Sequence, residues 1–215
     1  MKKRRFLKNN KGYSLIELII VIGIIALLTG AAMVTLTLIN SAKCKEAATT
    51  FEAEVSTLAA KSKNQVCKMY DPGTGTYVET TDYVYAIRIY EDSNGKNYIQ
   101  NGYYKASDAW NGEFVSFAEE NKNDGKGIYL TNKIYIRYDK EFKSSYSASK
   151  GLKDWTYNST SSSDTGVVIA FNRDGSMLSG YGDYYFIKNN SKKNSSSPNI
   201  VATVSLKVNG GSQSY

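Results

Sequence analysis

The sequence of 215 residues contains no histidine, and this absence removes several kinds of functional site. Without imidazole the chain can form neither a Ser-His nor a Cys-His nucleophile, and it can offer no histidine to a metal. Acidic residues are scattered along the chain, but no spacing marks two of them as a catalytic pair. The sequence therefore predicts a protein that is not an enzyme and that uses neither a cofactor nor a metal.

Cysteine is also scarce, since only Cys44 and Cys67 are present. The stretch from Ala42 to Val66 has neither proline nor glycine, which favours a continuous helix. Near-helical spacing within it predicts one buried face, made of Phe51, Val55, Leu58, Ser62 and Val66. Such a helix would separate the cysteines by about 34 Å, whereas a disulfide needs Cα atoms within about 7 Å. We therefore expect free or intermolecular thiols, because an intramolecular bridge requires a break in the helix.

Charge is almost absent from a long apolar run near the N-terminus. The run from Leu15 to Ile39 has Glu17 as its only charged residue. A helix of this length measures about 37 Å, enough to cross a bilayer core. An acid inside such a run costs about 2.5–3.5 kcal/mol on insertion scales, so Glu17 is a candidate functional residue. Six basic residues precede the run: Lys2, Lys3, Arg4, Arg5, Lys8 and Lys11.

Two ordinary explanations account for part of this pattern. A secretory signal could be cleaved near Gly30-Ala31-Ala32, but its apolar segment normally has about 7–15 residues and would not contain an acid. An uncleaved anchor with its basic end in the cytoplasm explains the length and the cations. Neither of them explains Glu17.

The segment Lys11-Gly12-Tyr13-Ser14-Leu15-Ile16-Glu17 resembles the leader of type IV prepilins and of the pseudopilins of type II secretion. The resemblance implies that a prepilin peptidase cleaves between Gly12 and Tyr13 on the cytoplasmic side of the membrane and methylates the new amine of Tyr13. It implies that Glu17 pairs with the terminal amine of a neighbouring subunit and sets the register of assembly. The implied partners are other pilin or pseudopilin subunits, an inner-membrane assembly platform and its ATPase.

The rest of the sequence predicts an α+β fold in four parts. A basic leader covers residues 1–12, a membrane-spanning or filament-core helix residues 13–40, and an amphipathic helix residues 41–67. An antiparallel, β-rich head outside the cytoplasm covers residues 68–215. Without the leader the chain has 21 basic and 20 acidic residues, so the net charge of +7 mainly reflects membrane topology.

Short runs of aromatic and β-branched residues in the head predict strands. They are Tyr83–Tyr90, Asn97–Lys105, Ile128–Tyr138, Gly166–Phe171, Tyr184–Lys188 and Ile200–Val208. Turns are expected at 71–75, 92–95 and 172–175, and the segment Trp110–Glu120 is compatible with a short helix or a loop. The Phe171-x-x-Asp174-Gly175 pattern resembles a hairpin of minor pseudopilins and minor pilins, which favours a minor subunit.

Two functional alternatives remain open at this level. A head on a membrane tether that binds a ligand without polymerising, similar to an adhesin, needs no role for Glu17. Nucleic-acid binding is a weaker possibility, based on lysines near aromatic rings. The candidate patches are Lys150, Lys153, Trp155 and Tyr157, and Lys188, Lys192 and Lys193.

Overall fold

The computed structural model describes residues 14–71, 73–106, 112–117, 125–140, 149–157, 165–188, 199–209 and 212–214. The chain divides into two compact units, Met1–Ile39 and Asn40–Tyr215. One helix, α1 (Leu15–Asn64), contributes to both units. The helix and the antiparallel sheets that follow it confirm the predicted α+β class.

In the first unit, α1 is apolar on all sides, and its described residues up to Leu38 are exposed. Three threonine hydroxyls in this part donate to carbonyl oxygens one turn earlier: Thr29 to Ile25, Thr35 to Ala31 and Thr37 to Met33, at 2.8, 2.9 and 3.1 Å. A polar group without a partner is costly in hydrocarbon. These bonds make the apolar surface compatible with lipid. By length and composition, α1 is the one helix among the described residues suited to crossing a membrane.

In the second unit, α1 buries one face. The buried residues recur at three- and four-residue spacing: Cys44, Ala47, Ala48, Phe51, Val55, Leu58 and Ser62. The predicted stripe is therefore confirmed from Phe51 to Ser62. Val66 was wrongly included, because α1 ends at Asn64 and Val66 is 37 % exposed.

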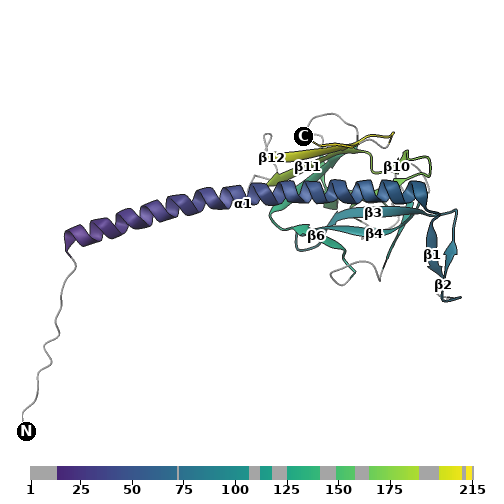
Figure 1. The fold of residues 1–215 in the computed structure, drawn as a ribbon, viewed down its shortest axis with the longest axis horizontal. Coiled ribbons are helices and arrows are strands. Elements are labelled where there is room, and N and C mark those ends of the chain that lie inside the picture. Colours follow the sequence, from purple (N-terminus) through teal and green to yellow (C-terminus); the bar gives the residue numbers. More distant parts are fainter. Residues whose placement is uncertain are drawn as a thin grey trace, which may run out of the picture. The chain divides into compact units, whose positions relative to one another are not determined.

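Two antiparallel sheets pack with this part of α1 (Figure 1). The first sheet has the order β10-β9-β3-β4-β5, with β6 also pairing with β4. Its strands are β3 (Val84–Glu91), β4 (Asn97–Ala106), β5 (Gly112–Ser116), β6 (Ile128–Thr131), β9 (Val167–Phe171) and β10 (Met177–Ser179).

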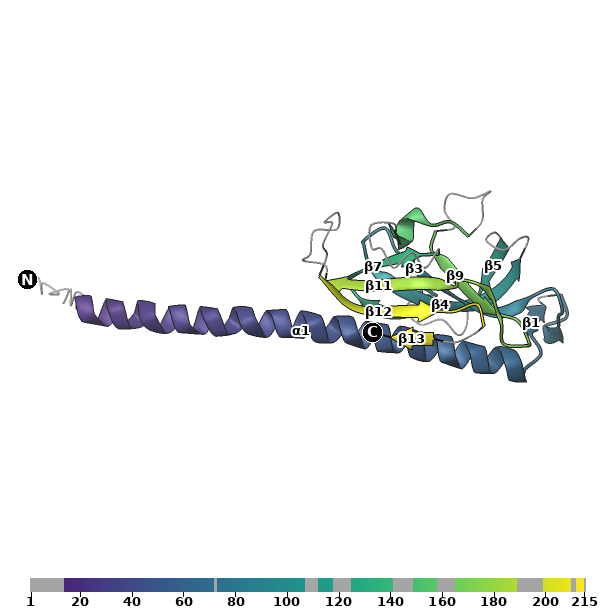
Figure 2. The ribbon, with the colours of Figure 1, turned by 90° about the horizontal axis from the view of Figure 1, so that it is seen from above.

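The second sheet has the order β13-β12-β11-β7-β8 (Figure 2). Its strands are β7 (Ile134–Asp139), β8 (Lys150–Gly151), β11 (Gly182–Lys188), β12 (Ile200–Leu206) and β13 (Ser212–Ser214). A short 3-10 helix, η2 (Leu152–Asp154), follows β8. A separate hairpin of β1 (Lys68–Asp71) and β2 (Thr76–Glu79) follows α1.

The core lies where α1 meets both sheets. Phe51 is fully buried, and its ring centroid lies 4.7 Å from that of Tyr184 and 5.7 Å from that of Phe186, both in β11. Ile87 and Ile89 of β3 belong to the same cluster, so one apolar core joins the helix to both sheets. Burial of the Phe51 ring of α1 against the rings of β11 stabilises the packing of the helix on the head.

Most predicted strands are confirmed, with two differences. The predicted run Ile128–Tyr138 is two strands, β6 and β7, interrupted at residues 132–133. The segment Trp110–Glu120, expected as a helix or loop, contains β5, which pairs with β4. Glycine is required in this pair, because a Cβ at Gly102 would lie 2.4 Å from the Phe114 ring and from the Val115 carbonyl oxygen.

The three predicted turns lie between paired strands: β1 and β2, β3 and β4, and β9 and β10. Each has a glycine in the region of positive φ that favours this residue: Gly75 at +68°, Gly95 at +73° and Gly175 at +88°. Asp174 supports the turn between β9 and β10, because its Oδ1 accepts hydrogen bonds from the Ser176 amide and hydroxyl at 2.8 and 2.6 Å. These bonds stabilise the ionised carboxylate and lower the pKa of Asp174.

Both cysteines are free and buried, and no intramolecular bridge joins them. The continuous helix expected as far as Cys67 was wrong at its end, because α1 stops at Asn64. Desolvation raises the pKa of each thiol to about 11, so both stay protonated at neutral pH.

We expect the native protein to resist iodoacetamide at pH 8, and the unfolded protein to take up two equivalents without added reductant. Intact-mass spectrometry before and after denaturation measures this. Failure of the unfolded chain to react would show that the thiols are bridged.

Candidate processing and assembly site

The N-terminal end of α1 is closed by two side chains of its own first turn. Ser14 precedes the first helical residue, and its hydroxyl oxygen accepts a hydrogen bond from the amide of Ile16 at 3.4 Å. The Glu17 carboxylate accepts one from the amide of Ser14 at 2.8 Å. The Leu18 amide donates to the Ser14 carbonyl oxygen at 3.2 Å. Ser14 is thus the N-cap, with its hydroxyl on the amide of the second helical residue, and Glu17, the third helical residue, makes the backward bond that is typical of a capping box.

The electrostatics of this position suit an acid. The first amides of a helix have no partner within the helix, and the aligned peptide dipoles leave partial positive charge there. Glu17 lies in this first turn, with its carboxylate directed to the backbone nitrogen of Ser14. A carboxylate held in this way is less costly in an apolar environment than one without a partner.

The other two predicted site residues, Gly12 and Tyr13, lie outside the described residues. Their assigned roles in cleavage and methylation therefore stay predictions. The Ser14 amide belongs to the peptide bond that follows Tyr13 in the sequence. The Glu17 carboxylate is thus bonded one residue away from the amine that the predicted cleavage would create.

Comparison with protein families decides the nature of this end of the chain. Residues 7–33 match the model of the prokaryotic N-terminal methylation motif. The chain carries the N-terminal signature of type IV pilins and pseudopilins. The signature covers the second half of the leader, with Lys8 and Lys11, the residues of the cap and much of the apolar helix. No curated protein and no solved structure is significantly similar to the chain.

The pilin signature supports a type IV pilin-like subunit that prepilin peptidase processes. The family that carries it is structural, and the apolar helix fits a membrane-anchored protein. Sequence reasoning identified Glu17 in this pilin-like chain but assigned no role to Ser14. The Ser-x-x-Glu pattern directly before an apolar run is the signal that finds it.

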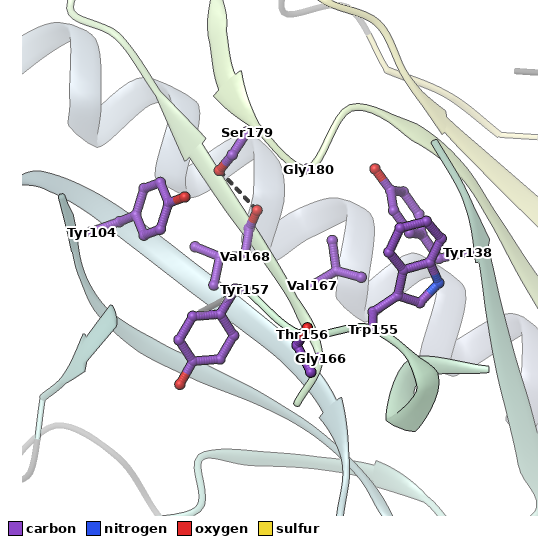
Figure 3. A pocket seen from close by; sticks show the side chains of 10 residues that line it. All are labelled: Tyr104, Tyr138, Trp155, Thr156, Tyr157, Gly166, Val167, Val168, Ser179 and Gly180. Carbon is purple, nitrogen blue, oxygen red and sulfur yellow. Dashed lines mark hydrogen bonds between the residues drawn. The ribbon is translucent and has the colours of Figure 1, made fainter. Parts of the chain in front are cut away.

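Two cavities among the described residues of the head are smaller than ordinary ligand pockets. One cavity, lined in part by Tyr138, Trp155 and Tyr157, has a volume of about 30 Å³, which is room for water rather than for a substrate (Figure 3). A second cavity of about 100 Å³ lies between α1 and β3, beside Leu58 and Tyr85. Ligand pockets usually measure about 300–1,000 Å³. Among the residues that the structure describes, no three Cys, Asp or Glu side chains cluster as a metal site.

The aromatic rings of the first candidate patch for nucleic acid already have contacts within the head. Tyr157 is 6 % exposed, and its hydroxyl accepts a hydrogen bond from Arg88 at 2.9 Å. Trp155 is partly exposed, and the ammonium groups of Lys140 and Lys150 lie 5.8 and 5.7 Å from its ring centroid. These cation–π contacts occupy the lysine and ring that stacking on a base would need. Of the second patch, Lys192 and Lys193 lie outside the described residues.

Proposed function

We propose that the chain is a structural subunit of a type IV pilus or of a related pseudopilus. Prepilin peptidase removes residues 1–12 by cleaving the bond between Gly12 and Tyr13, and the amine of Tyr13 is then methylated. Before assembly the subunit is a single-pass membrane protein. An inner-membrane assembly platform and its ATPase then assemble it into a filament at the cell surface. The observation that carries this proposal is the pilin signature at residues 7–33, continuous with an apolar helix that is exposed on all sides.

The charge distribution explains why the leader has to be removed. Filaments of this family bury their N-terminal helices together, and the leader would bring six cations into that bundle. Desolvating all of them would cost about 15–20 kcal/mol at a few kcal/mol each, although snorkelling reduces this cost. Cleavage leaves an apolar helix with one acid, Glu17, and one terminal amine. Opposite charges on neighbouring subunits then favour a defined register.

The burial of side chains along the chain supports a separate role for each of its segments. Residues 13–40 form the segment that spans the membrane and then joins the filament core. Residues 41–67 attach this segment to the head through the buried face around Phe51. Residues 68–215 form the outward-facing head, and its surface sets what the filament contacts. The hairpin of β1 and β2 adds the exposed rings of Tyr70 and Tyr77 to this surface.

The variant Gly12→Val tests the proposal, because a β-branched side chain before the scissile bond should block the peptidase. We expect the uncleaved chain to accumulate in the membrane and to be absent from the filaments sheared from the cell surface. Immunoblots of both fractions, with Gly30→Ala in α1 as the control, measure this. A Gly12→Val chain that reaches the sheared fraction uncleaved contradicts the proposal. A wild-type chain that never leaves the membrane favours the tethered binding module instead.

A further inference from the structure

We propose that the head binds one alkali metal cation, Na⁺ or K⁺, between the side chains of Glu91 and Asn97. These residues lie at the paired ends of β3 and β4 (Figure 1). They share a sheet face with Ile89 and Ile99, two residues away along each strand, which belong to the apolar core. The inference does not depend on the proposed function, because it concerns the head alone. The sequence predicted no metal, since one acid among neutral oxygens has no recognisable spacing.

The first argument is that the strand register brings the side chains together. Glu91 pairs with Asn97 across β3 and β4, and Asn97 pairs with Thr131 across β4 and β6. The Asp92 amide donates to the Lys96 carbonyl oxygen at 2.8 Å, which makes these two a hydrogen-bonded pair. The next pair along the ladder, Glu91 and Asn97, is therefore of the other kind, in which the Cα atoms are about 4.5 Å apart and the side chains are closest.

The second argument is that this pair buries two oxygens without a donor. Glu91 is 9 % exposed and Asn97 is 1 % exposed. Among the described residues, no donor reaches Oε2 of Glu91 or Oδ1 of Asn97. Within the same part of the chain, no lysine or arginine forms an ion pair with Glu91. A buried carboxylate is costly unless a positive partner compensates it, and two facing acceptors favour the same kind of partner.

The third argument is that the Asn97 amide is held in one orientation. Its Nδ2 donates to the carbonyl oxygen of Ile134 in β7 at 3.1 Å. Reversing the amide would set two acceptor oxygens against each other, so Oδ1 is the atom left for a ligand. Thr131, which is 7 % exposed, adds a hydroxyl oxygen to the same row. The Lys133 amide uses one lone pair of this oxygen, at 3.2 Å, and a second remains.

The ligand chemistry selects the class of ion. Carboxylate, carboxamide and hydroxyl oxygens are hard ligands, which suit alkali and alkaline-earth cations better than transition metals. One carboxylate balances one positive charge, so a monovalent ion leaves the buried site neutral. Calcium sites gain affinity from several charged ligands, and magnesium keeps several of its waters. The turn of the hairpin offers a path from solution, because a Cβ at Gly95 would lie 3.6 Å from Oε1 of Glu91.

Three substitutions separate the ion from other sources of stability. Glu91→Gln removes the charge and supplies an amide that can donate to Asn97, so this variant no longer needs a cation. Thr131→Val removes the hydroxyl oxygen and leaves the charge in place. Glu79→Gln is the matched control, because Glu79 is an exposed acid of the same head that pairs with Lys68 at 3.6 Å.

The experiment measures the melting temperature of the full chain in a non-ionic detergent by near-ultraviolet circular dichroism. The chloride salts of Na⁺, K⁺, Ca²⁺ and choline are compared at equal ionic strength. An ion at about five times its dissociation constant raises the folding constant about sixfold, which is a rise of about 2–4 °C for a head of this size. We expect this rise in Na⁺ or K⁺, relative to choline, for the wild type and Glu79→Gln.

The site variants should respond differently. Glu91→Gln should melt at one temperature in all four salts, and above the wild type in choline. Thr131→Val should show a smaller rise than the wild type. Equal melting of the wild type in all four salts would overturn the proposal and leave water as the partner of the two oxygens.

Two other results would also contradict it. A rise in Ca²⁺ alone would rule out a monovalent ion, and a rise that Glu91→Gln retains would place the ion elsewhere. If Glu91→Gln does not fold, the wild-type comparison and Thr131→Val still decide, because an unchanged rise in Thr131→Val together with none in choline-matched controls of the wild type cannot arise from this site.

Discussion

Glu17→Ala is expected to be cleaved and inserted like the wild type, yet to be almost absent from sheared filaments. Insertion should be as efficient or better, because the substitution removes an acid that costs about 2.5–3.5 kcal/mol in a membrane helix. Incorporation should fall because the terminal amine of the neighbouring subunit loses its partner. Removing one member of a buried ion pair costs about 3–5 kcal/mol, and 1.4 kcal/mol is a factor of ten. We therefore expect a loss of about a hundredfold or more.

The matched control is Glu46→Ala, which removes an exposed glutamate farther along the same helix, beyond the apolar run. This variant should enter filaments in normal amounts. Quantitative immunoblots of membrane and sheared fractions, with the N-terminus of each variant identified by mass spectrometry, make the comparison. Normal incorporation of Glu17→Ala would remove the registration role and favour a tethered head that does not polymerise.

Phe51→Ala is expected to destabilise the head more than any exposed substitution in α1. Phe51 is fully buried between the helix and β11, where it contacts the rings of Tyr184 and Phe186. Truncating a buried phenylalanine costs about 3–5 kcal/mol, because apolar contacts are lost and a cavity remains. For a head of this size, each kcal/mol lowers the melting temperature by about 2–4 °C. We therefore expect a decrease of about 10 °C.

Thermal unfolding of the processed chain in detergent, followed by near-ultraviolet circular dichroism, measures this change. Thr49→Ala is the control, since Thr49 is exposed and its hydroxyl bonds only to the Lys45 carbonyl oxygen in the same helix among the contacts described. It should shift the free energy of unfolding by no more than about 0.5 kcal/mol. A Phe51→Ala shift as small as that of the control would show that α1 is not packed on the head through this ring.

The sequence was most informative where a regular period or a strong chemical contrast was present. The face from Phe51 to Ser62 follows helical spacing, and Ile134, Ile136 and Tyr138 alternate along β7 and join the main core, so both elements were predictable. The residue between them, Tyr135, is also buried, in a smaller cluster with Tyr185 and Ile187. Glu17 could be identified because an acid is rare inside an apolar run. In each case the residue pattern itself carries the physical cause.

Other features depended on contacts between distant segments. β5 has only five residues and begins at Gly112, so local preference could not distinguish it from a loop. Its formation depends on pairing with β4, where Gly102 leaves room for the Phe114 ring. The break between β6 and β7 is likewise set by their different partners, β4 and β11. The role of Ser14 was local but was hidden, because serine has several common uses and the capping pattern is short.

The N-terminal mass of the native protein, compared between the membrane and the sheared surface fraction, tests the central claim most directly. The account predicts a chain that starts at Tyr13 and carries one additional methyl group, present in the sheared fraction. An intact Met1 in both fractions would contradict it and leave an ordinary membrane anchor, and a start near Met33 would indicate conventional secretion.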